Sequence, residues 1–139
     1  MNVLIDTNVI LDDLLNREPN KKTAREVSKL AVEGVIEGYI TASCLTDIFY
    51  LVSKKLNNSI AKQIVKNLIV SFEIISVDAN DCLNALNTHF DDFEDALVLI
   101  CAEKAALDFI ITNDKLFLHE KRLSVPTISP SDFILMHNK

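Results

Sequence analysis

The 139-residue sequence predicts an α/β fold built around a mostly parallel β-sheet. Short apolar runs suited to buried strands alternate along the chain with segments whose apolar residues recur at helical spacing. No internal repeat, linker or low-complexity segment interrupts this alternation, and the length is that of one ordinary domain. We therefore expect residues 1–139 to form a single α/β domain.

The expected strands are short and rich in apolar residues. The first of them ends directly before an acidic residue, Asp6, and the third carries mainly β-branched side chains, which favour strands. The last is the weakest of the five signals. The expected strands are Asn2–Ile5, Tyr39–Thr41, Glu73–Val77, Phe109–Thr112 and Val125–Ile128.

Helical patterns fill the intervals between these strands. Residues 21–37 show apolar residues at the spacing of a helix that packs on one face, and Gly34 and Gly38 bracket its end. Residues 96–102 are wholly apolar, which indicates a buried helix. Asp78 and Asp92 are suited to cap the helices that follow them. The expected helices span 9–15, 21–37, 45–56, 59–72, 79–88, 92–106, 116–119 and 131–136.

The composition excludes several classes of function. With 14 basic and 20 acidic residues, the net charge of −6 does not suit a simple basic coat for nucleic acid. Only two glycines are present, so a glycine-rich loop that cradles phosphates is excluded.

The three cysteines are widely spaced among apolar residues and include no CxxC pair, which indicates reduced thiols. No apolar run approaches the ~18 residues of a membrane span. We expect a cytoplasmic protein that does not enter a membrane.

Charge is distributed unevenly along the chain. Residues 17–66 carry nine basic and five acidic residues, whereas residues 67–103 carry eight acidic residues and no Lys or Arg. This distribution is consistent with a polyanion-binding surface beside a cation-binding pocket, and equally with ordinary variation of a solvated surface.

Four aspartates map to one edge of the predicted sheet. Asp6 and Asp114 follow the ends of two expected strands, while Asp47 and Asp95 are expected in the first turns of two helices. In open parallel sheets the functional crevice lies beyond the carboxyl ends of the strands. We therefore expect these carboxylates to converge there.

Converging carboxylates repel one another unless a cation compensates them. Oxygen ligands without His or Cys favour the hard cations Mg²⁺ or Mn²⁺, which can activate water for attack on a phosphodiester. No Ser-His-Asp or Cys-His arrangement competes, because the three histidines occupy peripheral contexts in the sequence.

Each acidic residue also has a purely structural interpretation. Asp6 can cap the helix that follows the first strand, and Asp92 can cap the helix at residues 92–106. Thr46 and Asp47 can cap the helix at 45–56, and Asn113 with Asp114 is a common turn pair. The metal-site hypothesis therefore depends on all four aspartates sharing one edge.

Four segments resemble the PIN-domain nucleases in the same order along the chain. They are the opening Val3–Leu11 (VLIDTNVIL), Thr46–Ile48 (TDI), Asp92–Leu97 (DFEDAL) and Phe109–Asp114 (FIITND). The resemblance spans nearly the whole chain, and the first and third motifs are the most specific.

The resemblance implies a three-layer α/β/α domain with a sheet of four or five strands, and an endoribonuclease that depends on Mg²⁺ or Mn²⁺. It implies a homodimer in many members, and VapC-like members are toxins neutralised by a small antitoxin. Carried over by matching position, the catalytic residues are Asp6, Asp47, Asp95 and Asp114, with Asp6, Asp95 and Asp114 as metal ligands. Thr7, Asn8, Asp92 and Asn113 are expected to be auxiliary residues.

The sequence departs from the family pattern at two positions. Asp47 stands where the family usually has Glu, and Asn113 stands where a basic residue often precedes the last acid. These departures motivate one alternative, a catalytically degenerate PIN-like module that binds RNA or protein. A phosphorelay receiver domain also uses an acidic crevice, but Asp6 is followed by Thr7 rather than by a second acid.

The basic block supplies the candidates for RNA binding. On the nuclease hypothesis the candidates are Lys21, Lys22, Arg25, Lys54 and Lys55. The same side chains are also what solvated helix faces carry, and no aromatic platform with basic interleaving is evident in the sequence.

Overall fold

The structure, a computed structural model that describes residues 1–121 and 123–139, confirms the predicted α/β fold. Five strands form one sheet in the order β3-β2-β1-β4-β5, and all four pairings are parallel. The elements in chain order are β1 (Asn2–Ile5), α1 (Thr7–Leu14), α2 (Lys21–Val32), β2 (Glu37–Thr41), α3 (Ala42–Lys55), α4 (Asn58–Ser71), β3 (Glu73–Ile75), α5 (Ala79–Leu86), α6 (Phe93–Lys104), β4 (Phe109–Ile111), α7 (Lys115–His119), β5 (Thr127–Ile128) and α8 (Pro130–His137).

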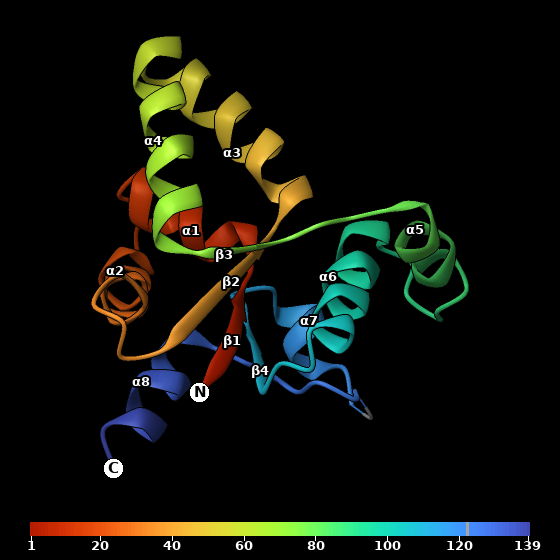
Figure 1. Cartoon of the computed structure of the whole chain (residues 1–139). Helices are drawn as coiled ribbons and strands as arrows, with labels where there is room; N and C mark the ends of the chain where they lie inside the picture. Colours follow the sequence, from red (N-terminus) through yellow and green to blue (C-terminus); the bar gives the residue numbers. More distant parts are fainter. Residues whose placement is uncertain (122) are drawn as a thin grey trace.

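Helices cover both faces of the sheet, as Figure 1 shows, with α1, α2 and α8 on one side and α5, α6 and α7 on the other. The side chains of the central strand β1 point alternately to the two faces of the sheet, which supports this arrangement. Val3 and Ile5 of β1 point into one hydrophobic cluster, and Leu4 points into the other. The three-layer α/β/α architecture is therefore confirmed.

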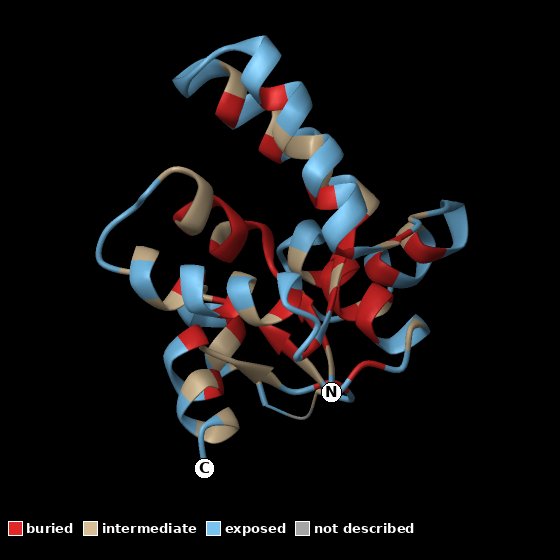
Figure 2. Ribbon diagram, turned by 60° about the vertical axis from the view of Figure 1, so that its left-hand side comes forward, coloured by how far each residue is buried: buried red, intermediate tan, exposed pale blue. Residues whose placement is uncertain are grey.

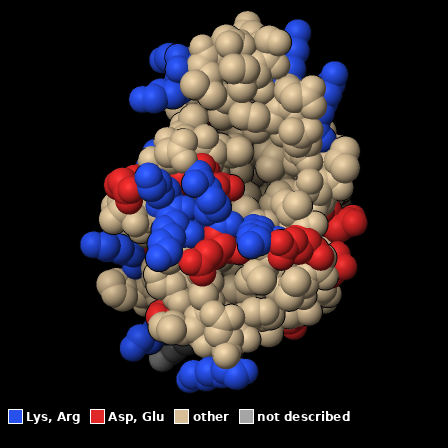
Figure 3. Space-filling model, turned by 90° about the vertical axis from the view of Figure 1, so that its left-hand side faces the viewer, with Lys and Arg blue, Asp and Glu red and all other residues tan. Residues whose placement is uncertain are grey.

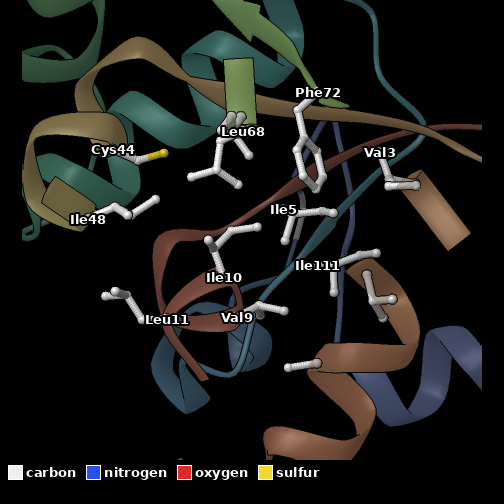
Figure 4. Close-up of a cluster of buried hydrophobic side chains, with 14 of the residues drawn as sticks. Val3, Ile5, Val9, Ile10, Leu11, Cys44, Ile48, Leu68, Phe72 and Ile111 are labelled. Carbon is white, nitrogen blue, oxygen red and sulfur yellow. The ribbon is translucent and has the colours of Figure 1, made fainter. Parts of the chain in front are cut away.

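The larger hydrophobic cluster joins the first four helices to the sheet. It brings together Val9 and Ile10 of α1, Ile48 of α3, Leu68 of α4 and Phe72, which directly follows α4 (Figure 4). Figure 2 shows the buried residues concentrated in the strands and in the helix faces that pack on them, while the α3–α4 hairpin extends away from the sheet with mostly exposed sides. The core therefore holds the sheet rigidly beneath the carboxyl ends of the strands.

The strand order has a switch point between β1 and β4. From β1 the chain adds β2 and β3 on one side, and then crosses to the other side to add β4 and β5. Chain segments that leave two such strands diverge and open a crevice at their carboxyl ends. The residues that follow β1 and β4 therefore lie on the two sides of this crevice.

The helix expected over residues 21–37 is too long. Helix α2 ends at Val32, because Gly34 adopts the left-handed conformation (φ 75°) that terminates helices. Gly38 does not cap the helix but lies in β2, where an added Cβ would come within 2.8 Å of Ala31 and of the Phe72 ring. Gly34 therefore serves the turn after α2, and Gly38 serves a close packing contact.

The apolar stretch of α6 is buried as its composition predicts, except that Ile100 is half-buried. Ala96, Leu97, Val98, Leu99, Cys101 and Ala102 are all buried, and they fill the space between the sheet and α5. In the described part of the chain, no helix combines the length and the apolar content needed to cross a membrane.

An ion pair fastens α5 to α6 on the outer face of this layer. Asp81 caps α5 reciprocally with Asp78, and its Oδ2 accepts a hydrogen bond of 2.6 Å from Lys104 Nζ. Lys104 also donates to the carbonyl of Ser76, just beyond β3. The Asp81 side chain is 6% exposed, and the Lys104 ammonium, followed by the Asp78 backbone N–H, lowers its pKa below the ordinary 3.8.

We expect Lys104→Met to reduce the free energy of unfolding at pH 7 by about 2 kcal/mol, because it leaves a buried carboxylate without its cation. The pKa of Asp81 is lower in the folded than in the unfolded state, so the pair stabilises the protein above pH 3.8 and this stabilisation disappears as the pH falls below it. The difference between wild type and variant should therefore shrink between pH 4 and pH 2 in urea titrations.

Lys29→Met is the matched control, since it removes an exposed pair with Glu33 at 3.9 Å. We expect it to change the free energy of unfolding by less than about 0.5 kcal/mol. A Lys104→Met effect that stays constant from pH 7 to pH 2 would contradict the role assigned to this pair.

Candidate active site

Asp6 lies at the carboxyl end of the central strand and is 5% exposed. Its backbone N–H continues the ladder between β1 and β4 by donating to the carbonyl of Ile111 at 2.9 Å. Its Oδ1 accepts from the Thr7 N–H at 2.9 Å, and its Oδ2 accepts from the Thr112 hydroxyl at 2.8 Å. Asp6 is therefore held from both strands that border the crevice, and it also begins α1 as its N-cap.

Asn8 connects the two sides of the crevice. Its amide nitrogen lies 3.4 Å from both Asp6 Oδ2 and Thr112 Oγ1, and its Oδ1 accepts from the Asn113 N–H at 3.2 Å. The predicted auxiliary residues Thr7, Asn8 and Asn113 thus all contact Asp6 or its supports. Asn8 therefore supports the Asp6 carboxylate, while the catalytic part of these auxiliary residues stays a prediction.

A pocket of about 520 Å³ opens above Asp6. Among the described residues, six carboxylates line it, together with Thr7, Asn8, Leu11, Tyr50, Leu51 and one cation, Arg17. The carboxylates are Asp6, Asp47, Asp92, Glu94, Asp95 and Asp114. The four aspartates predicted to share one sheet edge are therefore brought to one pocket. Their part in catalysis and in metal binding stays a prediction.

Asp47 reaches the pocket from a different part of its helix than expected. Helix α3 begins at Ala42, and Thr41 caps it by accepting from the Cys44 N–H, so Asp47 lies in the second turn and caps nothing. The helix predicted to start at Leu45 therefore begins three residues earlier, because Thr41 is its cap. Tyr50 and Leu51 lie one turn further along α3 and line the same pocket.

Asp92 and Asp114 combine helix capping with a place in the pocket. Asp92 Oδ1 accepts from the Asp95 N–H at 3.0 Å, and Asp114 Oδ1 accepts from the N–H groups of Leu116 and Phe117. Within residues 1–121 and 123–139, no hydrogen bond to the Oδ2 atom of either residue is recorded. The capping and pocket interpretations are therefore compatible, because each carboxylate has a second oxygen.

The carboxylates of the pocket disfavour one another's ionisation. Burial raises the pKa of Asp95 to about 7, and the charges of Asp92, Asp114 and Asp6 add to this effect. Burial also raises the pKa of Asp6, against the hydrogen bond from Thr112, and it raises that of Glu94. A bound cation would relieve this repulsion.

The donor set fits a hard divalent cation. It consists of carboxylate oxygens without His or thiolate, as Mg²⁺ and Mn²⁺ prefer. Among the described residues, however, no group of three Asp, Glu, His or Cys side chains is arranged so that it could hold a metal ion. Mutual repulsion is a sufficient reason for carboxylates to stand apart without an ion, so binding would have to draw them together.

Arg17 is placed at the pocket by a chain of polar contacts. Its Nε donates to Asp12 Oδ1 at 2.9 Å, and its Nη2 donates to the carbonyl of Asn8 at 3.3 Å. The other oxygen of Asp12 accepts from Asn113 Nδ2 at 2.8 Å. Asn113, which stands where the family often has a basic residue, thus helps to hold the carboxylate that positions Arg17.

The five residues predicted to bind RNA do not line the pocket. Lys21 and Arg25 of α2 pair with Glu18 and Asp13, and Lys54 lies over the Tyr50 ring near the distal end of α3. Lys22 on α2 and Lys55 on α3 are exposed. Figure 3 shows Lys and Arg side chains gathered with acidic ones at the level of α2. Their role in RNA binding stays a prediction.

The buried thiols offer no alternative chemistry here. Burial raises the pKa of Cys44 to about 12 and that of Cys101 to about 11, so both thiols stay protonated at neutral pH. His89, however, is less peripheral than expected, because it lines a second hollow beside Asp92 and Asp95.

Several residues that line the pocket were not predicted from the sequence. Tyr50 and Leu51 follow Asp47 at spacings of three and four, so helical periodicity could have found them. Glu94 belongs to the recognised motif at residues 92–97, and its place in a first helical turn was a usable signal. Arg17 follows α1 in a turn with no periodic pattern, and only the folded chain reveals its position.

Comparisons with known proteins find relatives of this chain. The model of the PIN domain family matches residues 2–116. Ribonuclease VapC1 of Aquifex aeolicus is 26% identical over 120 residues, which are 83% of this chain and 83% of that protein.

Solved structures share the fold at lower sequence identity. One is VapBC2 of Rickettsia felis bound to a promoter DNA fragment, with a TM-score of 0.68, 17% identity, and coverage of 93% of this chain and 98% of that one. Another is VapC20 of Mycobacterium tuberculosis, a toxin that cleaves the sarcin-ricin loop, with a TM-score of 0.65, 15% identity, and coverage of 81% and 90%.

We expect Asp95→Asn to stabilise the metal-free protein. The folded state raises the pKa of Asp95 from 3.8 to about 7, so ionisation destabilises the fold progressively as the pH rises from 4 to 7. The amide removes this penalty, and with allowance for partial solvent screening we expect a gain of about 1–2 kcal/mol at pH 8. Chemical unfolding in EDTA should show this gain at pH 8 and its disappearance near pH 4.

Asp132→Asn is the matched control, because Asp132 holds the corresponding third position of α8. It lies away from the pocket, and its loss should cost a few tenths of a kcal/mol through the helix dipole. If Asp95→Asn instead destabilises the protein at pH 8, the carboxylates do not repel one another as described.

Proposed function

The chain belongs to the PIN domain family, and we propose that it is a ribonuclease that cleaves RNA internally with the help of Mg²⁺ or Mn²⁺. The observation that carries this proposal is the pocket in which six carboxylates surround the end of the central strand with one arginine. The ribonuclease activity named for the Aquifex relative supports it. Family membership sets aside the phosphorelay receiver alternative.

Asp6, Asp95 and Asp114 would hold the metal ion, and Asp47 would bind it or orient the attacking water. When bound, such an ion polarises a phosphoryl oxygen and lowers the pKa of coordinated water. Thr7 and Thr112 hold the Asp6 carboxylate in one orientation at the end of the central strand, which supports this role. Asp92 and Asp114 present a second oxygen while the first one caps a helix.

Arg17 would contact the phosphodiester of the substrate. A guanidinium is suited to phosphate oxygens, and Arg17 is the cation that lines the pocket among the described residues. Asp12 and the Asn8 carbonyl use its Nε and Nη2, which orients the group and leaves further N–H donors for a ligand. This cation offsets part of the repulsion that six carboxylates exert on RNA.

Partners of this chain follow from the same comparisons. Neighbouring structures include a toxin-antitoxin complex from Klebsiella pneumoniae and VapBC-1 from nontypeable Haemophilus influenzae. We propose on that basis that this chain is a toxin and that a small antitoxin protein binds it. The expected homodimer is proposed with it, and size-exclusion chromatography with light scattering measures both assemblies.

We expect purified protein to cleave single-stranded RNA in Mg²⁺ or Mn²⁺ and to stop when EDTA removes the metal. Asp95→Asn should reduce kcat/KM by at least about 100-fold, because a metal site contributes several kcal/mol to the transition state. The same variant is expected to be more stable than wild type without metal, so the loss cannot be attributed to unfolding.

Asp132→Asn again serves as the control and should cleave RNA at the wild-type rate. RNA binding without cleavage in either metal would contradict the proposal and would favour the catalytically degenerate module. Equal activity of wild type and Asp95→Asn would mean that a contaminating nuclease is responsible.

We expect Arg17→Gln to lower kcat/KM about tenfold, since a hydrogen bond to a charged group contributes about 1.5–3 kcal/mol. The negative slope of the logarithm of the RNA-binding constant against the logarithm of the salt concentration should also become shallower by about 0.7. This is the amount for one lost phosphate contact with single-stranded RNA. Arg17→Lys should keep this slope while regaining only part of the activity.

Lys66→Gln removes one positive charge from the exposed face of α4, away from the pocket, and is the charge-matched control. An unchanged salt slope in Arg17→Gln, or an equal decrease in Lys66→Gln, would exclude a direct phosphate contact. Thermal melting of each variant separates these outcomes from loss of structure.

A further inference from the structure

A second hollow adjoins the carboxylate pocket. It has a volume of about 210 Å³ and shares Asp92 and Asp95 with the larger pocket. The segment before α6 and the two ends of α7 enclose it, through His89, Phe90, Asp91, Leu116, Phe117 and Glu120. This volume is below the roughly 300–1,000 Å³ of sites for drug-sized ligands, so it suits one flat ring system.

Aromatic rings form the wall of this hollow. The His89 ring stacks on Phe90 with 4.8 Å between centroids and an interplanar angle of 24°. Phe90 in turn packs edge-to-face on Phe117 at 5.7 Å, and Phe117 is only 1% exposed. The stack therefore begins in the hydrophobic core and ends at a histidine side chain that is 68% exposed.

Polar contacts keep the outermost ring in place. His89 Nε2 lies 3.1 Å from Glu120 Oε1, which ties the segment before α6 to the end of α7. The Thr88 hydroxyl donates to the carbonyl of Ala85 and accepts from the Phe90 N–H, which orders the segment itself. Leu116 is 82% exposed and supplies apolar surface beside the ring. An exposed ring held in one orientation loses little entropy when another ring stacks on it.

The polar groups of the hollow select for hydrogen-bond donors. Its lining includes four carboxylates, Asp91, Asp92, Asp95 and Glu120, and no Lys or Arg among the described residues. A phosphate would be repelled here, in contrast to the pocket side that holds Arg17. A nucleobase combines a flat face for stacking with N–H groups at its edge, and histidine is one of the side chains on which RNA bases stack.

We propose that this hollow, named the His89 subsite, binds the nucleobase next to the cleaved bond and favours guanine. Guanine carries two adjacent N–H donors on its pairing edge, which match the two oxygens of one carboxylate. The position of the subsite beside Asp92 and Asp95 places the bound base next to the groups proposed to act on the backbone. This inference rests on the proposed ribonuclease function and adds a basis for sequence preference to it.

The first experiment detects the base directly and needs neither metal nor cleavage. Guanosine 5′-monophosphate, uridine 5′-monophosphate and inorganic phosphate are titrated in EDTA while the histidine Cε1–H signals are followed by NMR. The His89 signal, assigned by its loss in His89→Ala, should shift with guanosine monophosphate, shift less with uridine monophosphate and stay unchanged with phosphate. The signals of His119 and His137 should not respond.

The second experiment connects the subsite to cleavage. With short RNAs that contain one guanosine or one abasic nucleotide among uridines, His89→Ala should lower kcat/KM about tenfold for the guanosine substrate. It should leave the abasic substrate unaffected. His119→Ala is the matched control, because His119 is an exposed histidine on α7 outside the hollow, and it should leave both substrates unaffected.

An absent His89 shift with guanosine monophosphate, or equal loss of activity on guanosine and abasic substrates, overturns the subsite. Equal shifts with both nucleotides overturn the preference for guanine. A protein that cleaves no RNA while His89 responds to guanosine monophosphate would refute the proposed function and leave the subsite standing.

Discussion

The burial of the Asp6 carboxylate at the end of the central strand is the constraint on which the rest of the site depends. A buried carboxylate is costly unless charges or hydrogen bonds compensate it. Here neutral donors provide the compensation, namely the Thr7 N–H, the Thr112 hydroxyl and the Asn8 amide, while its pKa remains raised. Two strands far apart in the sequence must therefore pair in one register to support a single side chain.

The same crevice separates two kinds of surface around the carboxylates. On one side Asp12 holds Arg17 at the rim, and on the other an aromatic stack rises from Phe117 to His89. A polyanion with flat bases matches this pattern better than a compact phosphate ligand, because a cation and a stacking surface line two adjoining hollows. The two adjoining hollows therefore combine carboxylates that repel one another with a cation and an aromatic stack.

Capping and function share the same side chains in this fold. Asp6, Asp92 and Asp114 each begin a helix at the crevice and each line the pocket. In Asp92 and Asp114 one carboxylate oxygen accepts from the helix N-terminus and leaves the other for the crevice, whereas Asp6 Oδ2 also accepts from the Thr112 hydroxyl. The structural interpretation and the proposed function of these residues, which compete at the level of sequence, are therefore compatible.

The sequence by itself determined the order of strands and helices, the parallel sheet and the sheet edge to which the aspartates map. These follow from local periodicity, from caps such as Asp92, and from the rule that crevices open at carboxyl ends of parallel strands. Only the tertiary structure decided the places of Arg17 and His89, since contacts between residues distant in sequence position them. Asn113 reaches Asp12 across 101 positions and Glu120 reaches His89 across 31, and no local pattern encodes such pairings.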